Sequence, residues 1–435
     1  MSDTIFSLHS WPQAIIHVDG DAFFTSCEEA IHPEIRGRAI VTGGERGIIA
    51  CASYTAKKMG IKRGVSILDA KRICPGLLIL PSDYETYSIF SRRMFHIIRQ
   101  YTPQVEEYSI DEAFADITGM RRAMRASYEI IASRIKEDVC RNLGINVSVG
   151  LSITKVLAKV ASKYQKPNGL TIISGRAIPV YLQNLPVQDV WGIGHATTNY
   201  LAKMGIRTAL EFARMPESVV KALFTKPGIE LWHELRGDSV YPVIAEEKSR
   251  YASISKTKTF APPTGDPDYL LAHLMRNLES ACIKARRYQL CVGRLVAYLK
   301  KQNFDCLGQE VKLSRPCVYP MELTEVIRNM FNLIYQSKEI YRATGIVLLD
   351  LDQSHERQYS LFEDPVRPEK IRALYKGVDS LCQKYGKHSL HLGGSHLLEE
   401  RGKGHRGTPT SREETLLPGE TKRKHLPLPI IHSKI

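Results

Sequence analysis

The sequence lacks the features that define several protein classes. None of its nine cysteines falls in a C-x-x-C pair, so zinc-binding and dithiol redox motifs are not expected, and an odd, unpaired count suits a reducing compartment. No run of about 18 apolar residues occurs, so no transmembrane segment is expected. The N-terminal stretch MSDTIFSLHSWPQ has neither a basic start nor a long apolar run, and we expect no signal peptide. These absences together predict a cytoplasmic protein.

Acidic residues are also scarce relative to basic ones. The 435 residues include 46 Asp and Glu against 60 Lys and Arg, a formal net charge of +14. Such a surplus favours a polyanionic partner, nucleic acid before a membrane surface; the alternative is a basic cytosolic protein with no such partner. The hydrophobic content of 43% and charged content of 24% are normal for a globular protein, and the length predicts three or four domains.

The N-terminal part contains a short apolar run that ends abruptly in carboxylates. Residues 14–18 (AIIHV) predict one buried strand, and Asp19, Gly20 and Asp21 follow it directly. A buried strand can hold a metal-binding carboxylate rigidly at its end. The alternative is a strand followed by an ordinary Asp-Gly turn.

Periodicity over the first 152 residues predicts a β-α-β-β-α-β order once a small Gly-rich insert at 37–78 is set aside. This is the split-βαβ, ferredoxin-like arrangement, in which the first strand can lie beside the central hairpin. Asp19 can therefore sit beside Asp111 and Glu112. The elements after the first strand are helix 83–101, a hairpin around 111–112, helix 121–142 and strand 145–151.

Three converging carboxylates favour cation chemistry. At about 4 Å, each like-charge pair costs on the order of 4 kcal/mol at an effective dielectric near 20, so cations bind or a carboxylate protonates. Oxygen ligands select Mg²⁺ or Mn²⁺ over zinc. Two such metal ions held close together are suited to in-line displacement at phosphorus. General acid–base catalysis fits less well, because nothing apolar obviously raises one pKa. Tyr54, Lys57 and Lys166 are candidate triphosphate donors, with Phe23 and Phe24 packing against the sugar.

Two later regions predict contacts with nucleic acid. The turn Gly192-Ile193-Gly194-His195 leads into a helix, whose exposed N–H groups suit a backbone phosphate, although any tight turn can use glycine this way. Residues 250–352 repeat the β-α-β-β-α-β order without the carboxylates, and 251–300 hold eight Lys/Arg against three Asp/Glu. One face of such a sheet can contact phosphates without reading sequence; the alternative is a solvated charged face. The candidate residues are Lys256, Lys258, Arg294 and Lys300.

Five motifs together resemble the Y family of lesion-bypass DNA polymerases, closest to the bacterial polymerase IV type. They are His17-Val18-Asp19-Gly20-Asp21-Ala22-Phe23-Phe24, Tyr54-Thr55-Ala56-Lys57-Lys58-Met59-Gly60, Tyr108-Ser109-Ile110-Asp111-Glu112-Ala113-Phe114, Gly150-Leu151-Ser152-Ile153-Thr154-Lys155 and Lys166-Pro167-Asn168-Gly169. The resemblance covers residues 13–362. It implies an α+β palm (13–36 and 79–175) with inserted fingers (37–78), a helix-hairpin-helix thumb (176–240) and a little finger (246–352).

The resemblance also implies residue roles. Asp19, Asp111 and Glu112 would hold two Mg²⁺ ions, with Mn²⁺ as a substitute and the Gly20 carbonyl assisting. Phe24 would be the steric gate against ribonucleotides, and Tyr54, Lys57 and Lys166 would hold the triphosphate. Asp21 is expected to be structural, with its side chain directed away from the site. The peptide at Gln358, Leu361 and Phe362 resembles the family's clamp-binding sequence.

Two fingers residues depart from the family pattern. Lys57 stands where arginine is usual, and lysine cannot make arginine's bidentate fork to phosphate; Cys51 stands where a small hydroxyl residue is common. The chain also continues beyond the clamp peptide: residues 353–398 comprise this peptide and a C-terminal extension, and a tail at 399–435 is expected to be disordered.

The sequence thus predicts an error-prone, template-directed translesion DNA polymerase. It would be a monomer of the bacterial cytoplasm, associated with the nucleoid, acting on primer–template DNA and dNTPs with the sliding clamp, without proofreading. The alternatives are a non-catalytic clamp-tethered accessory, a polymerase V-like subunit that needs partners, and a nucleotide cyclase with a similar palm.

Overall fold

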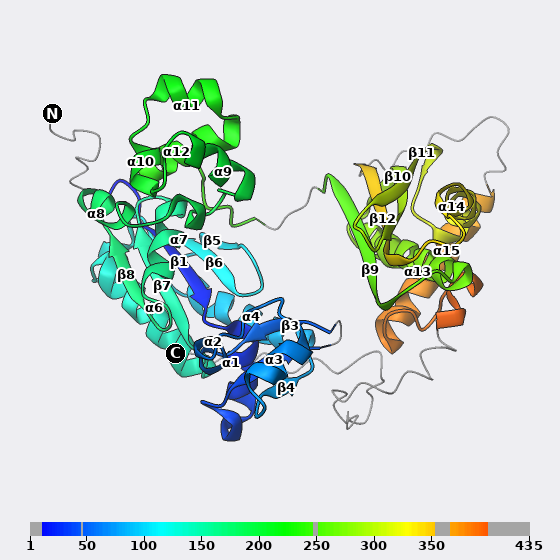
Figure 1. Cartoon of the computed structure of the whole chain (residues 1–435), viewed down its shortest axis with the longest axis horizontal. Coiled ribbons are helices and arrows are strands. Elements are labelled where there is room, and N and C mark those ends of the chain that lie inside the picture. Colours follow the sequence, from blue (N-terminus) through cyan, green and yellow to red (C-terminus); the bar gives the residue numbers. More distant parts are fainter. Residues whose placement is uncertain (1–10, 45–46, 247–250, 353–365, 399–435) are drawn as a thin grey trace. The chain divides into compact units, whose positions relative to one another are not determined.

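The structure is a computed structural model that describes residues 11–44, 47–246, 251–352 and 366–398. The chain forms two compact units (Figure 1). Within the described residues, the first unit contains 11–44 and 48–246, and the second contains 251–352 and 366–398. Each unit has its own hydrophobic core. No helix in the described ranges is both long enough and apolar enough to cross a bilayer.

A five-stranded sheet forms the centre of the first unit. Its strands lie in the order β5 (Val105–Glu107), β6 (Glu112–Asp116), β1 (Ile15–Gly20), β7 (Val147–Ser152) and β8 (Leu170–Ile173). β1 is antiparallel to β6 and to β7, whereas β7 and β8 are parallel. The predicted position of the first strand beside the hairpin is therefore confirmed. β8 is a fifth strand that the periodicity did not predict.

The two faces of this sheet are covered by different helices. Even-numbered residues of β1, such as Val18, pack in a core with α1 (Phe23–Ile31), α4 (Tyr84–Arg99) and α6 (Tyr128–Leu143). The odd-numbered residues face α7 (Lys155–Tyr164), because side chains alternate along a strand. Asp19 therefore lies on the face that α7 partly covers.

Side-chain caps determine where these helices begin. Asp83 accepts a hydrogen bond from the Thr86 N–H at the start of α4, and Ser127 and Thr154 do the same for α6 and α7. The predicted helix at 121–142 is divided, because Gly119 and Arg125 adopt the left-handed conformation on either side of the short helix α5 (Met120–Met124).

The insert predicted at 37–78 forms a small sheet of its own. Its order is β3 (Ile49–Ala52), β2 (Ile40–Gly43) and β4 (Leu78–Leu80), with β2 and β4 parallel. Helices α2 (Tyr54–Lys58) and α3 (Ile67–Ile73) complete it. The sequence predicted the insert but not this sheet, and β4 extends it two residues beyond the predicted boundary.

The remainder of the first unit is helical. Its core includes Val156, Leu157 and Val160 of α7, so this helical part packs directly on the helix that covers the sheet. The α-helices are α8 (Ile178–Leu182), α9 (His195–Lys203), α10 (Ala209–Ala213), α11 (Glu217–Leu223) and α12 (Lys226–Arg236); the short 3-10 helices of this unit are η2 (Pro33–Ile35), η3 (Gly175–Ala177) and η4 (Val187–Asp189).

The second unit is a four-stranded antiparallel sheet with its helices on one face. The elements follow in the predicted β-α-β-β-α-β order: β9 (Ser253–Thr264), α13 (Pro267–Arg287), β10 (Cys291–Lys301), β11 (Cys306–Cys317), α14 (Pro320–Ile334) and β12 (Tyr341–Asp352). The strand order, however, is β11-β10-β12-β9. The first strand, β9, thus lies at the edge and pairs only with β12, whereas β1 of the other sheet is central, between β6 and β7.

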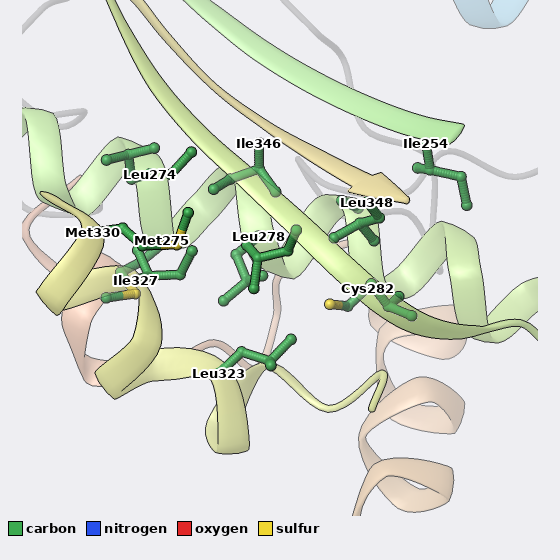
Figure 2. Packing of buried hydrophobic residues seen from close by; sticks show 14 of the residues in the cluster. Ile254, Leu274, Met275, Leu278, Cys282, Leu323, Ile327, Met330, Ile346 and Leu348 are labelled. Carbon is green, nitrogen blue, oxygen red and sulfur yellow. The ribbon is translucent and has the colours of Figure 1, made fainter. Parts of the chain in front are cut away.

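The core of the second unit fills the space between this sheet and its helices. Figure 2 shows Ile254, Ile346 and Leu348 of the sheet above Leu278 of α13 and Leu323 of α14. Within the extension predicted at 353–398, α15 (Val366–Tyr385) adds Ile371 and Tyr375 to this core, and η5 (Gly393–Ser395) follows it. The tail at 399–435 lies outside the described residues.

Candidate active site

The end of β1 and the β5–β6 hairpin bring the predicted carboxylates together. Asp19 lies directly opposite Glu112 in the antiparallel register. The Gly20 N–H donates to the Asp111 carbonyl oxygen at 2.8 Å, so the backbone holds Asp111 beside the end of β1. The Ser109 hydroxyl is 2.6 Å from an Asp111 carboxylate oxygen and 3.4 Å from one of Glu112. Sequence reasoning missed Ser109, although it precedes both acids in the hairpin.

Lysine side chains neutralise these carboxylates. Lys159 of α7 lies 3.0 Å from Glu112, and Lys166, in the loop after α7, forms an ion pair with Asp19. One turn before Lys159, Lys155 pairs with Glu106 of β5 at 2.6 Å. Residues spaced by four lie on one face of a helix, so α7 presents a row of ammonium groups to the hairpin.

The position of α7 depends on Gly150. A Cβ atom at this residue of β7 would overlap the Ala158 carbonyl oxygen and the Ser162 amide nitrogen, so only glycine lets the helix backbone approach so closely. On the same face, the His17 ring lies 2.7 Å from the Ser162 hydroxyl. Gly150 thus sets the distance of the lysine row from the carboxylates.

Burial controls the electrostatics of Asp19. Desolvation is the largest effect and raises the pKa of this carboxyl from 3.8 to about 6. Lys166 lowers the pKa, and the charges of Glu112 and Asp111 raise it again. Lys159 and Lys166 pair with Glu112 and Asp19, two of the three predicted carboxylates, so the site retains an attraction for further cations.

The donor set fits a hard divalent ion better than a soft one, because it consists of carboxylate oxygens. In the described part of the chain, no three His, Cys, Asp or Glu side chains are already arranged to hold a metal. Asp19 and Glu112 are turned to their lysines instead. The residues fit such an ion by chemistry and by residual charge, and their final ligand geometry stays a prediction.

Asp21 does not point away from the site, and that prediction is wrong. Two residues after Asp19, it lies on the same side: Lys166 is 3.6 Å from Asp21 and also pairs with Asp19. Its carboxylate accepts from the Ser148 hydroxyl, and Ser148 is the register partner of Asp19 on β7. The physical reason is the period of two along a strand, which places residues i and i+2 on one face and not on opposite faces.

The two phenylalanines after the strand have different environments. Phe23 is 2% exposed and packs in the core of the first sheet, beneath Gly20, where a Cβ atom would meet its ring at 2.7 Å. Phe24 is half-buried and stacks on Tyr87 with ring centres 4.5 Å apart. Only Phe24 therefore retains appreciable exposed surface, and contact between Phe23 and a sugar stays a prediction.

Two of the residues predicted to hold a triphosphate, Tyr54 and Lys57, lie on α2 of the insert. The Tyr54 hydroxyl lies 3.3 Å from an Asp21 carboxylate oxygen, which joins α2 to the end of β1. Burial, with the nearby Asp21 charge, raises the pKa of Tyr54, so its phenol remains a hydrogen-bond donor at neutral pH. Lys57 is exposed and its ammonium lies 4.3 Å from the centre of the Tyr54 ring.

The turn predicted to bind phosphate precedes α9. Gly192 has a φ of 97°, which only glycine adopts easily, and Gly194 is the N-cap of the helix without a side-chain cap. Gly192, Gly194 and His195 are exposed, whereas Ile193 is buried in the helical core. The exposed N–H groups are consistent with the prediction but do not test it.

The predicted cations of the second unit divide between two faces. Lys256 and Lys258 share the face of buried Ile254 on β9, so they lie on the helix-covered side, at the edge of the sheet. Arg294 and Lys300 lie on the open face, but Arg294 is bound at 2.8 Å by Asp350 and by Glu310. Sequence reasoning could not see this neutralisation, because the three residues lie on three strands.

A groove of about 410 Å³ opens beside Lys300 on this face. Lys300 and Arg342 both lie over the ring of Phe304, at 5.1 and 4.0 Å from its centre. In the described ranges, neither cation has an ion pair with an acid. The groove is lined by Thr257, Thr259, Tyr298, Lys300, Phe304, Cys306, Arg342 and Ala343. The predicted clamp residues Gln358, Leu361 and Phe362 lie outside the described residues.

Comparisons with known proteins agree with this architecture. The impB/mucB/samB family matches residues 18–163, and the C-terminal domain of the same family matches 251–361. The chain is 32% identical over 379 residues to DNA polymerase IV of Desulfatibacillum aliphaticivorans, covering 86% of this chain and 94% of the relative. It is 33% identical over 386 residues to DNA polymerase IV of Moorella thermoacetica, covering 87% and 95%.

Solved structures share the fold. A Y-family DNA polymerase chimera, Dbh-Dpo4(243-245)-Dbh, matches with a TM-score of 0.67 at 24% identity, covering 78% of this chain and 100% of the chimera. The chain thus has the multidomain α+β fold of a template-copying polymerase. It belongs to the Y family of translesion DNA polymerases, among the homologues of DNA polymerase IV, and its enzyme class is DNA-directed DNA polymerase.

Proposed function

We propose that the chain adds dNTPs to a primer 3′-end at the carboxylate cluster of β1 and the hairpin. The observation that carries this proposal is the cross-strand pairing of Asp19 with Glu112, with Asp111 held by the Gly20 N–H. In the family's terms, the five-stranded sheet is a ferredoxin-like palm (13–36 and 79–175), the three-stranded insert is the fingers (37–78), 176–240 is the thumb and 246–352 is the little finger.

Asp19, Asp111 and Glu112 would hold two Mg²⁺ ions, or Mn²⁺, with the Gly20 carbonyl assisting. Bound there, the ions would lower the pKa of the primer 3′-hydroxyl and neutralise charge on the leaving pyrophosphate. The protein itself keeps these carboxylates on rigid strand ends and, through Ser109, fixes the two hairpin acids relative to each other.

Lys166, Tyr54 and Lys57 bind the triphosphate. In the free protein Lys166 is the counter-ion of Asp19, and the tyrosine hydroxyl is aligned by Asp21. Lys57 contacts phosphate through one point charge, since lysine has no planar fork. Phe24 acts as the steric gate against a 2′-hydroxyl, a role supported by its half-buried ring, and Phe24→Ala should therefore admit ribonucleotides in a primer-extension assay with rNTPs. Unchanged sugar selectivity would remove this role.

Primer–template DNA is bound mainly through its phosphates. The exposed turn 192–195 and the Lys300 groove supply sequence-independent contacts, as expected of an enzyme that copies any template. A clamp contact through residues 358–362, a monomeric state and a cytoplasmic, nucleoid-associated location complete the proposal.

A non-catalytic accessory that only binds DNA is the main competing function. Such a protein would not need a carboxylate cluster neutralised by buried lysines, and a nucleotide cyclase would not need the second basic unit. A polymerase V-like subunit would have the same site but would need partners for activity.

Primer extension with Mg²⁺ tests the proposal directly. The wild-type chain should extend a primer, and Asp111→Asn should reduce the rate by about 10³-fold or more, since it removes a charge that the transition state requires. Asp116→Asn is the matched control, because Asp116 lies at the far end of β6 and its carboxylate accepts from the Thr118 N–H in its own turn. A wild-type chain that extends no primer with Mg²⁺ or Mn²⁺, alone or with the clamp, would overturn the proposal.

A further inference from the structure

Asp21 is the most fully bonded carboxylate near the site. It is 1% exposed and accepts from the Ser148 hydroxyl at 2.8 and 3.0 Å, from the Asn168 N–H at 2.6 Å and from the Tyr54 hydroxyl at 3.3 Å. The Lys166 ammonium is 3.6 Å away. The two carboxylate oxygens share the single Ser148 proton, and in addition one accepts from the Tyr54 hydroxyl and the other from the Asn168 N–H.

The partners of Asp21 come from segments far apart in the sequence. Ser148 belongs to β7, Tyr54 to α2 of the insert, and Asn168 to the loop that carries Lys166. Two of the three side chains proposed to hold the triphosphate, Tyr54 and Lys166, thus meet at one buried carboxylate.

We infer that Asp21 is a positioning residue that sets the affinity for the incoming nucleotide. It fixes the tyrosine hydroxyl of the insert and the lysine loop of the central sheet relative to each other, so that both reach the same triphosphate. The inference rests on the proposed function, and it assigns Asp21 a role distinct from that of Asp19.

The bonding of Asp21 argues against a role as a metal ligand. Each of its oxygens already accepts from protein donors, including a backbone N–H that cannot move away without displacing the 166–169 loop. That loop is itself tightly closed, because a Cβ atom at Gly169 would overlap the Gln165 carbonyl oxygen. Removing a buried acceptor from these donors is costly, since they would be left unsatisfied.

Steady-state kinetics of Asp21→Asn test the inference. An amide keeps the shape but replaces one acceptor oxygen by an NH₂ donor, so it cannot accept from both the Tyr54 hydroxyl and the Asn168 N–H. We expect the KM for dNTP to rise about tenfold or more while kcat changes less than about threefold, because hydrogen bonds to charged groups contribute on this scale. Asp116→Asn should change neither constant.

A double-mutant cycle with Tyr54→Phe separates the effect that Asp21 exerts through the Tyr54 hydroxyl from the effect that it exerts through the loop of Lys166. If Asp21 acts through the tyrosine hydroxyl, Asp21→Asn should raise KM less in the Tyr54→Phe background than in the wild type. Additive effects in both this cycle and a cycle with Lys166→Met would overturn the positioning role, since residues that act through one another are non-additive.

Ion binding distinguishes positioning from ligation. Mn²⁺ affinity of the nucleotide-free protein, measured by electron paramagnetic resonance, should fall in Asp19→Asn and stay within about twofold of wild type in Asp21→Asn. An equal loss in both variants would overturn the inference and make Asp21 a ligand. If Asp21→Asn does not fold, Ser148→Ala removes one of the hydrogen-bond donors to Asp21 and should show the same KM effect; an unchanged KM there would also overturn the inference.

The inference and the proposed function fail differently. A chain that extends no primer contradicts the proposed function, whereas the binding of a fluorescent dNTP to the protein–DNA complex still reports on Asp21. An active wild type with equal KM values in Asp21→Asn contradicts only the inference.

Discussion

The two large sheets of this molecule share an element order but differ in what covers them. Both arise from a β-α-β-β-α-β sequence, with two helices packed on one face. On the first sheet, α7 also covers much of the opposite face and brings lysines to the carboxylates. On the second, that face stays open and carries Arg294, Tyr298 and Lys300. The first sheet thus has an additional helix that pairs its lysines with the hairpin acids, and the second sheet has no such helix on its open face within the described residues.

The ion pairs of the two sheets also differ in burial: those of the first sheet are more buried than those of the second. The ion pairs of the first sheet join side chains that are largely buried, where removal of one partner leaves an uncompensated charge. The Arg294 pairs of the second are more exposed, where such pairs contribute little to stability. Substitutions in the first sheet should therefore have the larger effects.

The largest effect should come from Gly150→Ala. The new Cβ would strike the backbone of α7, which cannot move aside as a side chain can, so we expect the free energy of unfolding to fall by about 3 kcal/mol or more. Denaturant unfolding followed by circular dichroism would measure it. Gly345→Ala is the counterpart on the second sheet, where the new Cβ meets the Tyr298 ring; because a ring can shift, a smaller decrease is expected. Equal decreases would break the comparison.

The next effect is the pH dependence of the metal-free protein. The folded pKa of Asp19, about 6, is above its ordinary 3.8, so its favourable contribution is complete below pH 3.8 and disappears as pH rises through 6. The free energy of unfolding of wild type relative to Asp19→Asn should fall by about 2–3 kcal/mol between pH 4 and pH 7, measured in EDTA.

Asp350 on the second sheet provides a control of opposite sign. Its hydrogen bond with Arg294 lowers the pKa of this carboxyl, so its contribution is present above its ordinary pKa and disappears as pH falls. Wild type relative to Asp350→Asn should therefore lose stability toward acid pH. A shift of the same sign in both variants would contradict the contrast between the two sheets.

The smallest effect concerns DNA affinity on the open face. Lys300→Ala and Arg342→Ala should each weaken primer–template binding several-fold at low salt, and each should reduce the salt dependence of log K by about one unit for every phosphate that the variant no longer binds. The double variant Arg294→Gln/Asp350→Asn keeps the net charge and removes a pair that is already neutralised, so binding should stay within about twofold. Fluorescence anisotropy at several salt concentrations measures the affinity and its salt dependence for each variant. A larger loss of affinity in the Arg294→Gln/Asp350→Asn variant than in Lys300→Ala or Arg342→Ala would contradict DNA binding at the groove.

Local patterns were sufficient to predict much of this architecture. The strand ending at Asp19, the hairpin at Asp111 and Glu112, and the long helices of both units follow from periodicity and stop signals, which are properties of neighbouring residues. The parallel pairing of β2 with β4 and the order of the second sheet depend on partners far apart in sequence, and two strand orders are compatible with one element order.

The same distinction applies to the site. The carboxylates and lysines were visible as residue types, but their pairing was not. No residue near Arg294 in the sequence indicates that Asp350 and Glu310 neutralise it, and none near Asp21 indicates that the 166–169 loop folds over it. Ion pairs and buried hydrogen bonds are tertiary properties that no local pattern encodes.

The contact at Gly150 has a consequence for how the enzyme can vary. Helix α7 rests on β7 through main-chain atoms, so its height above the sheet does not depend on the size or rotamer of any interchangeable side chain. The apolar residues on the far face of the sheet can then be exchanged for others without displacing the ammonium groups from the acids. This backbone contact fixes the distance between the lysines of α7 and the acids, so substitutions in the core can accumulate without changing that distance.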